Sequence, residues 1–569
     1  MKLENLTPQK IKGFDARALK SLTDDIRQFL ITSVQKTGGH LSSNLGMVEL
    51  TIALHYCFDS PTDKFLWDVG HQAYTHKILT GRYNQFDKLR KKDGLTGFPN
   101  PVESVHDHFS TGHASTALSS ALGMAVGRDL TGDKNKVIAI FGDGSLTGGI
   151  TLEAINNTGA SQRDVIAILN DNELSISENV GALHSNPAAK KAFFEATGFK
   201  YIGPVDGHNL PELITLFNEV KTYNCPVLVH VKTQKGKGHT PAQDEPIKYH
   251  GVTATTGAMQ VERKKTYSEI LGEELTKLAQ SNKNIVAITA AMSAGTGLDY
   301  FKNALPERFF DMGITEQHSL IFASALAKSG LTPVIGMYST FLQRAYDQLI
   351  HDVCLGNHHV VFCIDRAGLV GEDGETHQGV YDISYLSHIP NMTVMSPKNK
   401  EEFIQMLDFA VNRHSGPIAI RYPKDIPSEE MGCAPIKYAQ PELINSGEVV
   451  ALISFGNITQ TVNKVYQRLK EDGYNPTFIN ARFAVPNPLN ESLINDLKSK
   501  HSYIFTFEEN MKSGGFGNLI NNDGLDVTYM FGVDKAYIQT ASRNELLEIC
   551  KLDKDSIYEK IKEIIRGEA

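Results

Sequence analysis

The sequence predicts an α/β protein built from three doubly wound domains with mainly parallel sheets. The chain has 569 residues, which is enough for three or four domains of ordinary size. Short runs rich in β-branched residues recur between longer stretches with helical spacing, as expected for strands that are buried on both faces of a parallel sheet. Two polar stretches that contain proline, 235–265 and 422–441, divide these runs into three blocks.

The predicted strands follow these blocks in order. In the first block they are 137–141, 165–169 and 227–231; in the second 285–289, 309–314, 333–337, 360–364, 392–395 and 418–421; in the third 449–455, 477–479, 503–507 and 527–531. We therefore expect domains over 1–255, 256–430 and 431–569. Isoleucines at helical spacing in 555–566 predict a last helix that packs on the core.

Composition and charge exclude several classes of function. The chain carries 56 Lys and Arg against 65 Asp and Glu, a net charge of -9, which is the wrong sign for binding nucleic acid or an anionic membrane. Its six cysteines form no C-x-x-C pair, which argues against a zinc site and against a disulfide framework. No apolar run approaches the roughly 20 residues of a membrane span, and the first 14 residues do not resemble a signal peptide, so we expect a cytoplasmic protein.

Polar residues follow two successive predicted strands of the first block. The segments 142–145, Gly-Asp-Gly-Ser, and 170–172, Asn-Asp-Asn, each come directly after a strand. Ligands of open α/β sheets bind beyond the carboxyl ends of the strands, so Asp143 and Asn172 are expected in one crevice. A carboxylate, an amide oxygen and a diphosphate together suit Mg²⁺. Taken alone, the Gly-Asp-Gly segment also fits a simple tight turn, and the pair of segments is the more specific signal.

This pair of segments resembles the fingerprint of the transketolase-like thiamine diphosphate enzymes, which implies that the carbonyl of Leu174 is a third metal ligand. Such enzymes also need a carboxyl group beside the aminopyrimidine ring of the cofactor. Glu316, which follows the predicted strand 309–314, is our candidate, although a glutamate in such a position is more often a surface or capping residue. Phe341 is the candidate for packing against the ring.

Histidines and arginines complete the candidate site. Histidine titrates near neutral pH and is suited to proton transfer, although a structural role is the commoner one for any single histidine. Four histidines lie in glycine-rich turns, where a side chain can point into a cleft: His40, His71, His113 and His377. Arg366 and Arg421 lie at the ends of two strands of the second block, where guanidinium groups would bind a substrate phosphate.

Longer motifs narrow the resemblance to one family. The stretches 38–46, 170–181, 201–208, 338–348 and 365–379 together resemble the 1-deoxy-D-xylulose-5-phosphate synthases. The resemblance implies a transketolase-like fold, with thiamine diphosphate and Mg²⁺ as cofactors and pyruvate and D-glyceraldehyde 3-phosphate as substrates. The products would be carbon dioxide and 1-deoxy-D-xylulose 5-phosphate, a precursor of isoprenoids, thiamine and pyridoxal. A homodimer in the bacterial cytoplasm is also implied.

The same resemblance gives each candidate residue a role at its matching position. The implied metal ligands are Asp143, Asn172 and Leu174. The implied cofactor contacts are His71, Gly112, His113, Ala114, Gly144, Ser145, Asn172, His239, Glu316 and Phe341, with Glu316 as the activating acid. The implied polar groups of the active site are His40, His250, Asp373 and His377, and the implied acceptor-phosphate site is Tyr338, Arg366 and Arg421.

The chain departs from the family pattern at three places. Between Leu183 and Phe199 the family usually has a considerably longer segment near the active site, so we expect a cover over the cleft to be missing and substrate gating to be affected. His239 stands where the family commonly has a tyrosine that contacts the cofactor. The stretch 532–542 lacks a usual glycine, and we expect that change to affect assembly more than chemistry.

Two other hypotheses stay open. One is a transketolase-like paralogue with a different donor or acceptor, against which the stretch 365–379 argues. The other is an inactive thiamine diphosphate binder, against which the intact Asp143, Asn172, Glu316 and His377 argue. A dinucleotide-dependent dehydrogenase is excluded, because no G-x-G-x-x-G follows an early strand.

Overall fold

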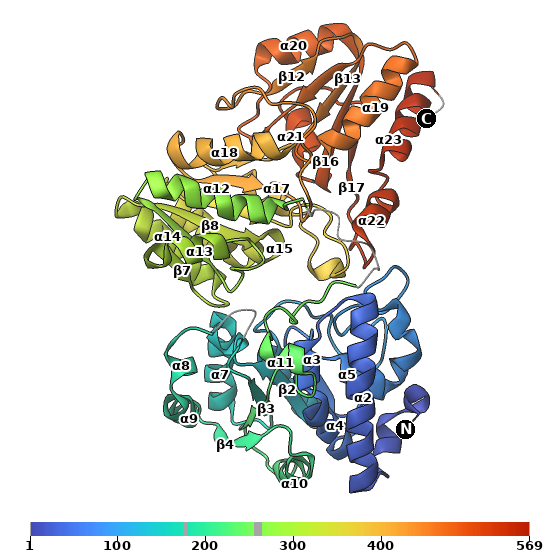
Figure 1. The fold of residues 1–569 in the computed structure, drawn as a ribbon, viewed down its shortest axis with the longest axis vertical. Helices are drawn as coiled ribbons and strands as arrows, with labels where there is room; N and C mark the ends of the chain where they lie inside the picture. Colours follow the sequence, from blue (N-terminus) through green and yellow to red (C-terminus); the bar gives the residue numbers. More distant parts are fainter. Residues whose placement is uncertain (1, 175–178, 255–263, 568–569) are drawn as a thin grey trace. The chain divides into compact units, whose positions relative to one another are not determined.

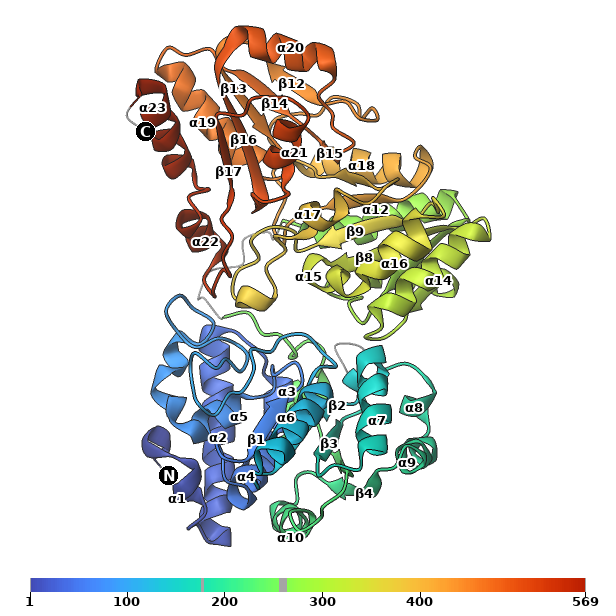
Figure 2. The ribbon, with the colours of Figure 1, turned by 180° about the vertical axis from the view of Figure 1, so that it is seen from behind.

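The computed structural model describes residues 2–174, 179–254 and 264–567 and contains three β-sheets flanked by helices (Figures 1 and 2). The chain forms two compact units. The first comprises Met1–Met259, Gly313–Thr315 and Glu372–Thr376, and the second comprises the rest of the chain. The predicted boundary after residue 255 lies outside the described residues.

A five-stranded parallel sheet, of order β1-β2-β3-β5-β4, forms the centre of the first unit. Its strands are β1 (Lys64–Trp67), β2 (Val137–Gly142), β3 (Ile166–Asp171), β4 (Lys200–Asp206) and β5 (Val227–Lys232). The three predicted strands are the three inner ones. The two strands that the sequence pattern did not indicate, β1 and β4, are the edges of the sheet.

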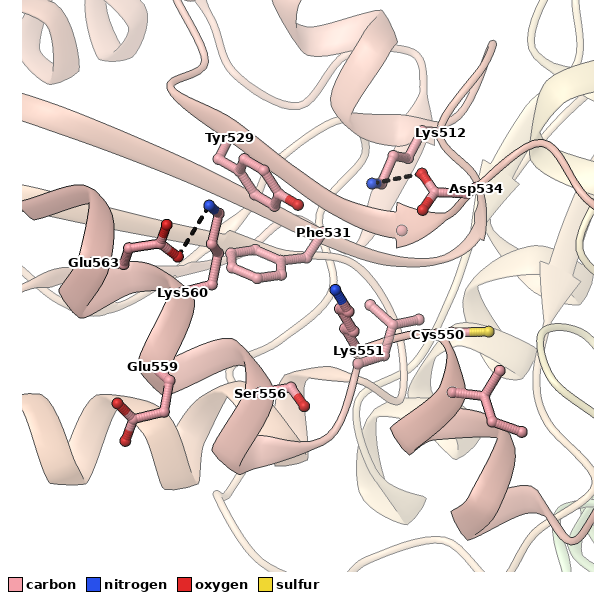
Figure 3. A pocket seen from close by; sticks show the side chains of 13 residues that line it. Lys512, Tyr529, Phe531, Asp534, Cys550, Lys551, Ser556, Glu559, Lys560 and Glu563 are labelled. Atoms are coloured by element: carbon pink, nitrogen blue, oxygen red, sulfur yellow. Dashed lines mark hydrogen bonds and ion pairs between the residues drawn. The ribbon is translucent and has the colours of Figure 1, made fainter. Parts of the chain in front are cut away.

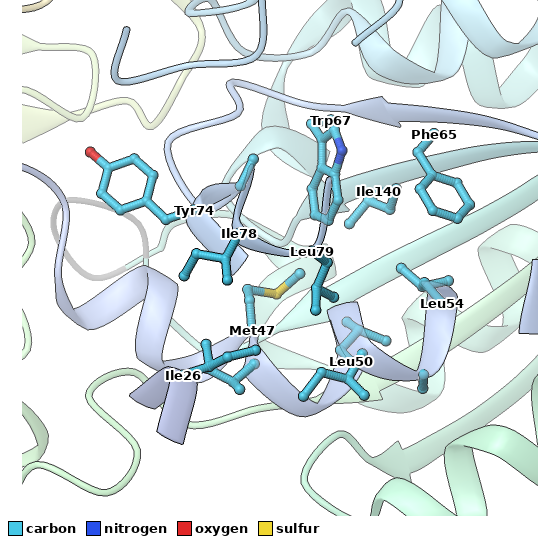
Figure 4. Packing of buried hydrophobic residues seen from close by; sticks show 14 of the residues in the cluster. Ile26, Met47, Leu50, Leu54, Phe65, Trp67, Tyr74, Ile78, Leu79 and Ile140 are labelled. Atoms are coloured by element: carbon cyan, nitrogen blue, oxygen red, sulfur yellow. The ribbon is translucent and has the colours of Figure 1, made fainter. Parts of the chain in front are cut away.

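Both faces of this sheet are covered by helices, because alternate side chains of each strand point to opposite faces. Ile138 and Ile140 of β2 pack in one apolar cluster with α2 (Ala16–Thr37), α4 (Val48–Cys57) and α10 (Leu210–Val220) (Figure 4). Val137 and Ala139 pack in a second cluster with α6 (Ala117–Thr131), α7 (Gly149–Ser161) and α9 (Pro187–Ala196). Each large aliphatic side chain buried in this way contributes about 1.5–3 kcal/mol. The prediction of a doubly wound sheet is confirmed for this unit.

The stretch 235–265, which we expected to be a linker, instead packs within the first unit over its described part. Gly39 and Val252 form an antiparallel bridge, and the backbone N–H of Ser42 donates to the carbonyl of Tyr249 at 2.9 Å. The described part of the stretch is therefore not a free linker, because its backbone groups form hydrogen bonds with the loop 38–46. The shorter helices of this unit are α1 (Pro8–Ile11), α3 (Ser42–Gly46), α5 (Tyr74–Lys77), α8 (Ala182–Ser185) and α11 (Thr240–Asp244).

The second unit contains a seven-stranded sheet of order β15-β10-β11-β9-β8-β6-β7. Its strands are β6 (Ile285–Thr289), β7 (Phe309–Asp311), β8 (Thr332–Tyr338), β9 (Val361–Asp365), β10 (Thr393–Met395), β11 (Ile418–Arg421) and β15 (Phe483–Val485). The six predicted strands are parallel, and β15 adds to the edge in the antiparallel direction.

Helices again cover two faces of this sheet. One apolar cluster joins it to α12 (Tyr267–Ser281), α13 (Asp299–Ala304) and α18 (Lys400–Asn412). A second cluster joins it to α14 (Glu316–Lys328) and α17 (Asp382–Leu386). The short helices α15 (Ser339–Leu342) and α16 (Tyr346–Gln348) follow β8.

The same unit carries a third sheet, of order β12-β14-β13-β16-β17. Its strands are β12 (Glu442–Asn445), β13 (Val449–Ser454), β14 (Thr477–Asn480), β16 (His501–Met511) and β17 (Tyr529–Val533), and its helices are α19 (Thr459–Glu471), α20 (Glu491–Lys500), α21 (Phe516–Asn522), α22 (Arg543–Ile549) and α23 (Lys554–Arg566). Ile557 and Ile561 of α23 are buried, as predicted. Among the described residues, no helix combines the length and apolar character needed to cross a bilayer.

Candidate active site

Asp143 and Asn172 follow neighbouring parallel strands of the first sheet, as predicted. The backbone N–H of Asp143 donates to the carbonyl of Asn170 at 3.2 Å. The Asp143 side chain is 4% exposed, and its Oδ2 has no hydrogen-bond partner within the described ranges. Burial and, to a smaller extent, the nearby negative charge of Asp171 raise the pKa of this carboxyl to about 7. A buried, unpaired carboxylate oxygen is a natural position for a cation.

The predicted oxygen donors of Asn172 and Leu174 lie in one turn after β3. The backbone N–H of Leu174 donates to Oδ1 of Asn172 at 3.3 Å, and both residues are half-buried. Residues 175–178 of the motif 170–181 lie outside the described residues. Across the described part of the chain, no three His, Cys, Asp or Glu side chains gather as a metal site. A metal here would therefore need amide and carbonyl oxygens besides Asp143.

Asp171, the last residue of β3, belongs to a buried network that the sequence pattern did not indicate. Its Oδ2 lies 2.5 Å from Nζ of Lys190 and 2.7 Å from Nε2 of His230. The hydroxyl of Tyr201 lies 2.5 Å from Nδ1 of the same histidine. Burial raises the pKa of Asp171, but the hydrogen bonds from His230 and Lys190 outweigh burial and hold it well below its usual range. The Asp171 side chain is therefore a fixed carboxylate.

Asp68, directly after β1, connects the loop that contains Gly112, His113 and Ala114 to the Gly-Asp-Gly segment. Its carboxylate accepts hydrogen bonds from the backbone of Ser115 at 2.8 Å and of Ala117 at 3.0 Å. It also accepts one from the hydroxyl of Ser145 at 2.5 Å. The predicted cofactor contacts at 112–114 and 144–145 are thus held together by one buried carboxylate.

The segment 372–376 of the first unit holds two further contacts. Nε2 of His113 lies 2.9 Å from the carbonyl oxygen of Thr376, and Asp373 forms an ion pair with Arg90 at 2.7 Å. Gly112 has a φ of +152°, and a Cβ there would lie 2.3 Å from the hydroxyl oxygen of Thr376. The loop therefore requires glycine at this position.

Three of the predicted histidines form one cluster. The ring centroids of His40, His71 and His250 lie 5.1 to 5.5 Å apart. Nδ2 of Asn44 donates to the carbonyls of both His40 and His71 at 2.7 Å, which fixes their backbone. Burial lowers the pKa of His71 and of His250 well below the usual value, so both are neutral at neutral pH. Nδ1 of His71 is buried and has no hydrogen-bond partner among the described residues.

Lys235 lies near this cluster and near Asp143. It is buried, and burial lowers its pKa to about 8 against the opposing effect of the Asp143 carboxylate. The available sequence signal was its place three residues after β5, at the same edge of the sheet as Asp143. His239 is half-buried, with its ring centroid 5.9 Å from that of Tyr249.

In the second unit, Glu316 is the first residue of α14 and is almost completely buried. Burial raises its pKa, and the positive charge of Arg344 opposes the shift. A carboxyl group in this state can hold a proton closer to neutral pH than an exposed glutamate can. This environment differs from that of the surface or capping glutamate that we weighed as the alternative.

Aromatic rings and an arginine lie together after β8 and β9. Tyr338 and Phe341 stack with ring centroids 5.7 Å apart, and the ring of His377 lies 5.5 Å from that of Phe341. The guanidinium of Arg366 lies 3.8 Å from the centroid of the Tyr338 ring and 2.9 Å from Asp365. The structure thus brings together four of the residues predicted for this part of the chain.

Arg421 ends β11, and Arg366 directly follows the neighbouring strand β9, so the two arginines predicted to bind phosphate lie at adjacent strand ends. The Arg421 side chain is buried, and its Nε lies 3.0 and 3.1 Å from the two oxygens of Asp382. Its Nη2 donates to the carbonyl of Glu509 at 3.1 Å. The structure gives its Nη1 no hydrogen bond to any described residue. The Nε and Nη2 side of this guanidinium is therefore already bonded within the protein, and Nη1 remains for a ligand.

A cavity of about 590 Å³ beside β17 contains none of the predicted site residues (Figure 3). Four of its charged side chains form two ion pairs: Lys512 with Asp534 at 2.8 Å, and Lys560 with Glu563 at 3.0 Å. The other two charged residues of the lining, Lys551 and Glu559, have opposite charges, so the cavity gives no reason to assign it a charged ligand.

Comparisons with known proteins cover nearly the whole chain. The family model described as 1-deoxy-D-xylulose-5-phosphate synthase matches residues 3–189 and 184–233, two pieces that meet at α9. The models of the pyrimidine-binding and C-terminal domains of transketolase match residues 263–427 and 439–557. Among solved structures, a transketolase from Campylobacter jejuni is 17% identical, with a TM-score of 0.47 over 96% of this chain and 100% of that one.

Two curated relatives extend over nearly the full length. The 1-deoxy-D-xylulose-5-phosphate synthase of Natranaerobius thermophilus is 44% identical over 99% of this chain and 98% of its own. The 1-deoxy-D-xylulose-5-phosphate synthase 1 of Geobacter sulfurreducens is 47% identical over 91% of this chain and 89% of its own. The first alignment runs over 622 positions, more than the 569 residues of this chain, so part of that relative has no counterpart here. From these matches, this chain belongs to the 1-deoxy-D-xylulose-5-phosphate synthase family.

Proposed function

We propose that this chain catalyses the reaction for which its relatives are named, as a transketolase-type transferase. It decarboxylates pyruvate with thiamine diphosphate and joins the two-carbon unit to D-glyceraldehyde 3-phosphate, which gives 1-deoxy-D-xylulose 5-phosphate and carbon dioxide. The observation that carries this proposal is the 44% identity over 99% of the chain. The product is a precursor for isoprenoid synthesis. We propose that it is also a precursor for thiamine and pyridoxal synthesis.

The residues of the first unit fit a diphosphate with a divalent metal. The orphaned Oδ2 of Asp143 would bind the metal, together with the amide oxygen of Asn172 and the carbonyl of Leu174. These are hard oxygen donors, which Mg²⁺ prefers and supplements with phosphate oxygens. The segments 112–114 and 144–145, which hydrogen bonds to Asp68 hold together, would bind the diphosphate.

When bound, thiamine diphosphate supplies the carbon nucleophile that attacks pyruvate and accepts the electrons left by carbon dioxide. Glu316 would bind the aminopyrimidine ring and hold a proton there, which its burial and raised pKa favour. Phe341 would pack against the cofactor, and His239 would contact it in place of the usual tyrosine. His71 would contact the cofactor from the histidine cluster.

The remaining polar groups would handle protons and bind the substrates. His71 and His250 are neutral, so each has a ring nitrogen that can accept a proton, and Nδ1 of His71 is unpaired in the described structure. His40, Asp373 and His377 would act with them. Tyr338, Arg366 and Arg421 would bind the phosphate of the acceptor, Arg421 through its Nη1.

We also propose a homodimer in the bacterial cytoplasm, with domains over 1–255, 256–430 and 431–569. The matches to the family models support these boundaries, because one model ends and the next begins between 233 and 263 and again between 427 and 439. The three sheets, one for each proposed domain apart from β15, support them too.

The test of the reaction is carbon dioxide release from pyruvate by the purified chain with thiamine diphosphate and Mg²⁺. We expect release that depends on D-glyceraldehyde 3-phosphate, with a product of the mass of a deoxyxylulose phosphate. Release without the aldehyde, or with another acceptor only, would identify a paralogue of different specificity. Cofactor binding without any turnover would identify an inactive binder.

A further inference from the structure

The helix α9 begins where the match to the family model is divided into two pieces. The two pieces of the family model meet at 184–189, at the start of α9 (Pro187–Ala196). Asn186 caps this helix, because its side chain accepts a hydrogen bond from the backbone of Ala189 at 3.1 Å. The shortened segment is thus a capped helix, with its own contacts to the sheet.

Two adjacent lysines of α9 have opposite environments. Lys190 is 2% exposed, whereas the side chain of Lys191 is 57% exposed and lies 3.8 Å from Glu195 on the same helix. A lysine is almost never fully buried unless it is paired. The burial of Lys190 therefore reflects a specific contact of its ammonium group.

That contact is with the residue directly before the proposed metal ligand Asn172. Nζ of Lys190 lies 2.5 Å from Oδ2 of Asp171, the last residue of β3. His230 contacts the same oxygen at 2.7 Å from the neighbouring strand β5. The Asp171 side chain is thereby held from the sheet and from α9 at once, so the turn that begins at Asn172 starts from a fixed position.

The ion pair also places a cation beside one of two neighbouring acidic groups. Asp143 directly follows β2, and Asp171 ends the adjacent strand β3, so two carboxyl groups lie at neighbouring strand ends. Like charges in a poorly solvated place repel strongly unless a cation lies close to one of them. Lys190 supplies such a cation, on the side of Asp171 that α9 covers.

We propose that Lys190 is a positioning residue for the metal site: its ion pair with Asp171 ties the shortened segment to the turn that carries Asn172 and Leu174. This inference rests on the proposed function, because it assigns the metal to that turn. Residues around a metal site that orient its ligands typically contribute 10–100-fold to metal affinity. The effect of Lys190 should therefore appear in Mg²⁺ binding.

The test is a calorimetric titration of Mg²⁺ into the full chain with saturating thiamine diphosphate and no substrate. We expect Lys190→Met, which keeps the length of the side chain, to weaken Mg²⁺ binding at least tenfold. The matched control Lys191→Met should change it less than twofold. Unchanged binding in Lys190→Met, while the wild type binds normally, would overturn the inference and leave the proposed function standing. A wild-type chain that binds no Mg²⁺ would overturn both.

A second comparison separates positioning from a general loss of packing. In the background Asp171→Asn the partner charge is absent, so adding Lys190→Met should change Mg²⁺ affinity less than twofold further. A further tenfold loss in that background would show that Lys190 acts through other contacts and would overturn the proposal. This comparison also decides the matter if Lys190→Met alone does not fold, since the double variant leaves no unpaired buried carboxylate.

Discussion

At the scale of single residues, burial gives the candidate carboxyl groups their chemistry. Asp143 and Glu316 are both almost completely buried, and burial raises the pKa of each. Their surroundings differ. Asp143 lies near Lys235 and leaves one oxygen unpaired, which suits a cation. Glu316 lies at the start of an apolar helix, which suits a carboxyl that shares a proton with a ring nitrogen.

Replacing Glu316 tests this second role. We expect Glu316→Gln to lower kcat by at least a hundredfold, because the amide cannot exchange a proton with the ring, and general acid–base groups contribute about 10²–10⁴-fold. Thiamine diphosphate should still bind, since in our proposal other residues hold the diphosphate and the metal. Steady-state kinetics and calorimetry on the same preparation provide the measurement. Near-normal kcat would remove Glu316 from this role.

Site residues that directly follow a strand could be predicted from the sequence. Contacts between residues that are distant in the sequence could not. Asp143 and Asn172 were predictable because each follows an apolar run of strand length. Lys190 and His230 were not, since their common partner Asp171 brings them together from a distant helix and strand. Nothing in the local pattern distinguishes Lys190 from Lys191; only tertiary packing does.

At the scale of elements, the predicted strands include every interior strand of the three sheets and two of the edge strands, β7 and β17. The four strands that the pattern missed, β1, β4, β12 and β15, are all edge strands. An edge strand pairs on one side only, so it can be short or polar, as β4 is, and it lacks the continuous apolar run of a central strand. The doubly wound fold was therefore predictable, whereas four of the six edge strands were not.

The junction of β16 and α21 contains an unusual carboxyl group whose titration should be measurable. Glu508 of β16 is buried and accepts hydrogen bonds from the backbone of Phe516 at 2.7 Å and of Gly517 at 2.9 Å. Burial raises its pKa to about 8 against the opposing effect of these hydrogen bonds. The folded chain thus holds a proton that the unfolded chain has lost above its ordinary pKa of 4.5. Its contribution to stability is complete below that value and is lost as the pH rises through about 8.

The glutamine in Glu508→Gln cannot ionise, so the variant should not lose stability in this way as the pH rises. We expect its thermal midpoint, relative to the wild type, to rise steadily in scans from pH 5 to pH 8.5. The exposed Glu471→Gln, at the end of α19, serves as the control and should shift the midpoint equally at every pH. A Glu508→Gln difference that is constant over this range would contradict the titration of Glu508.

At the scale of the whole molecule, one apolar cluster spans the second and third sheets. It contains Ile335 and Ala419 from the second sheet and Ile453 and Ile479 from the third. The strand β15 comes after three strands of the third sheet in the chain, yet pairs with β10 of the second. The two sheets therefore share a core, so changes in the last 140 residues can reach the strands that carry Arg366 and Arg421.

The surface of the second unit also bears on the proposed homodimer. Ile321 of α14 and Leu355 are 44% and 75% exposed and line one shallow depression. Exposed apolar side chains that lie together mark interaction surfaces more often than scattered ones do. We propose that this surface contacts the second copy of the chain.

Light scattering after size exclusion tests both the assembly and this surface. The wild type should elute with twice the 62.7 kDa mass of one chain. Leu355→Asp should shift it toward one chain at micromolar concentration, because burying an unpaired carboxylate in an interface costs several kcal/mol. The matched control is Leu130→Asp on α6, where the leucine is 82% exposed and the charge should leave the mass unchanged. A wild-type mass of one chain would refute the dimer, whereas a dimeric Leu355→Asp would place its interface elsewhere.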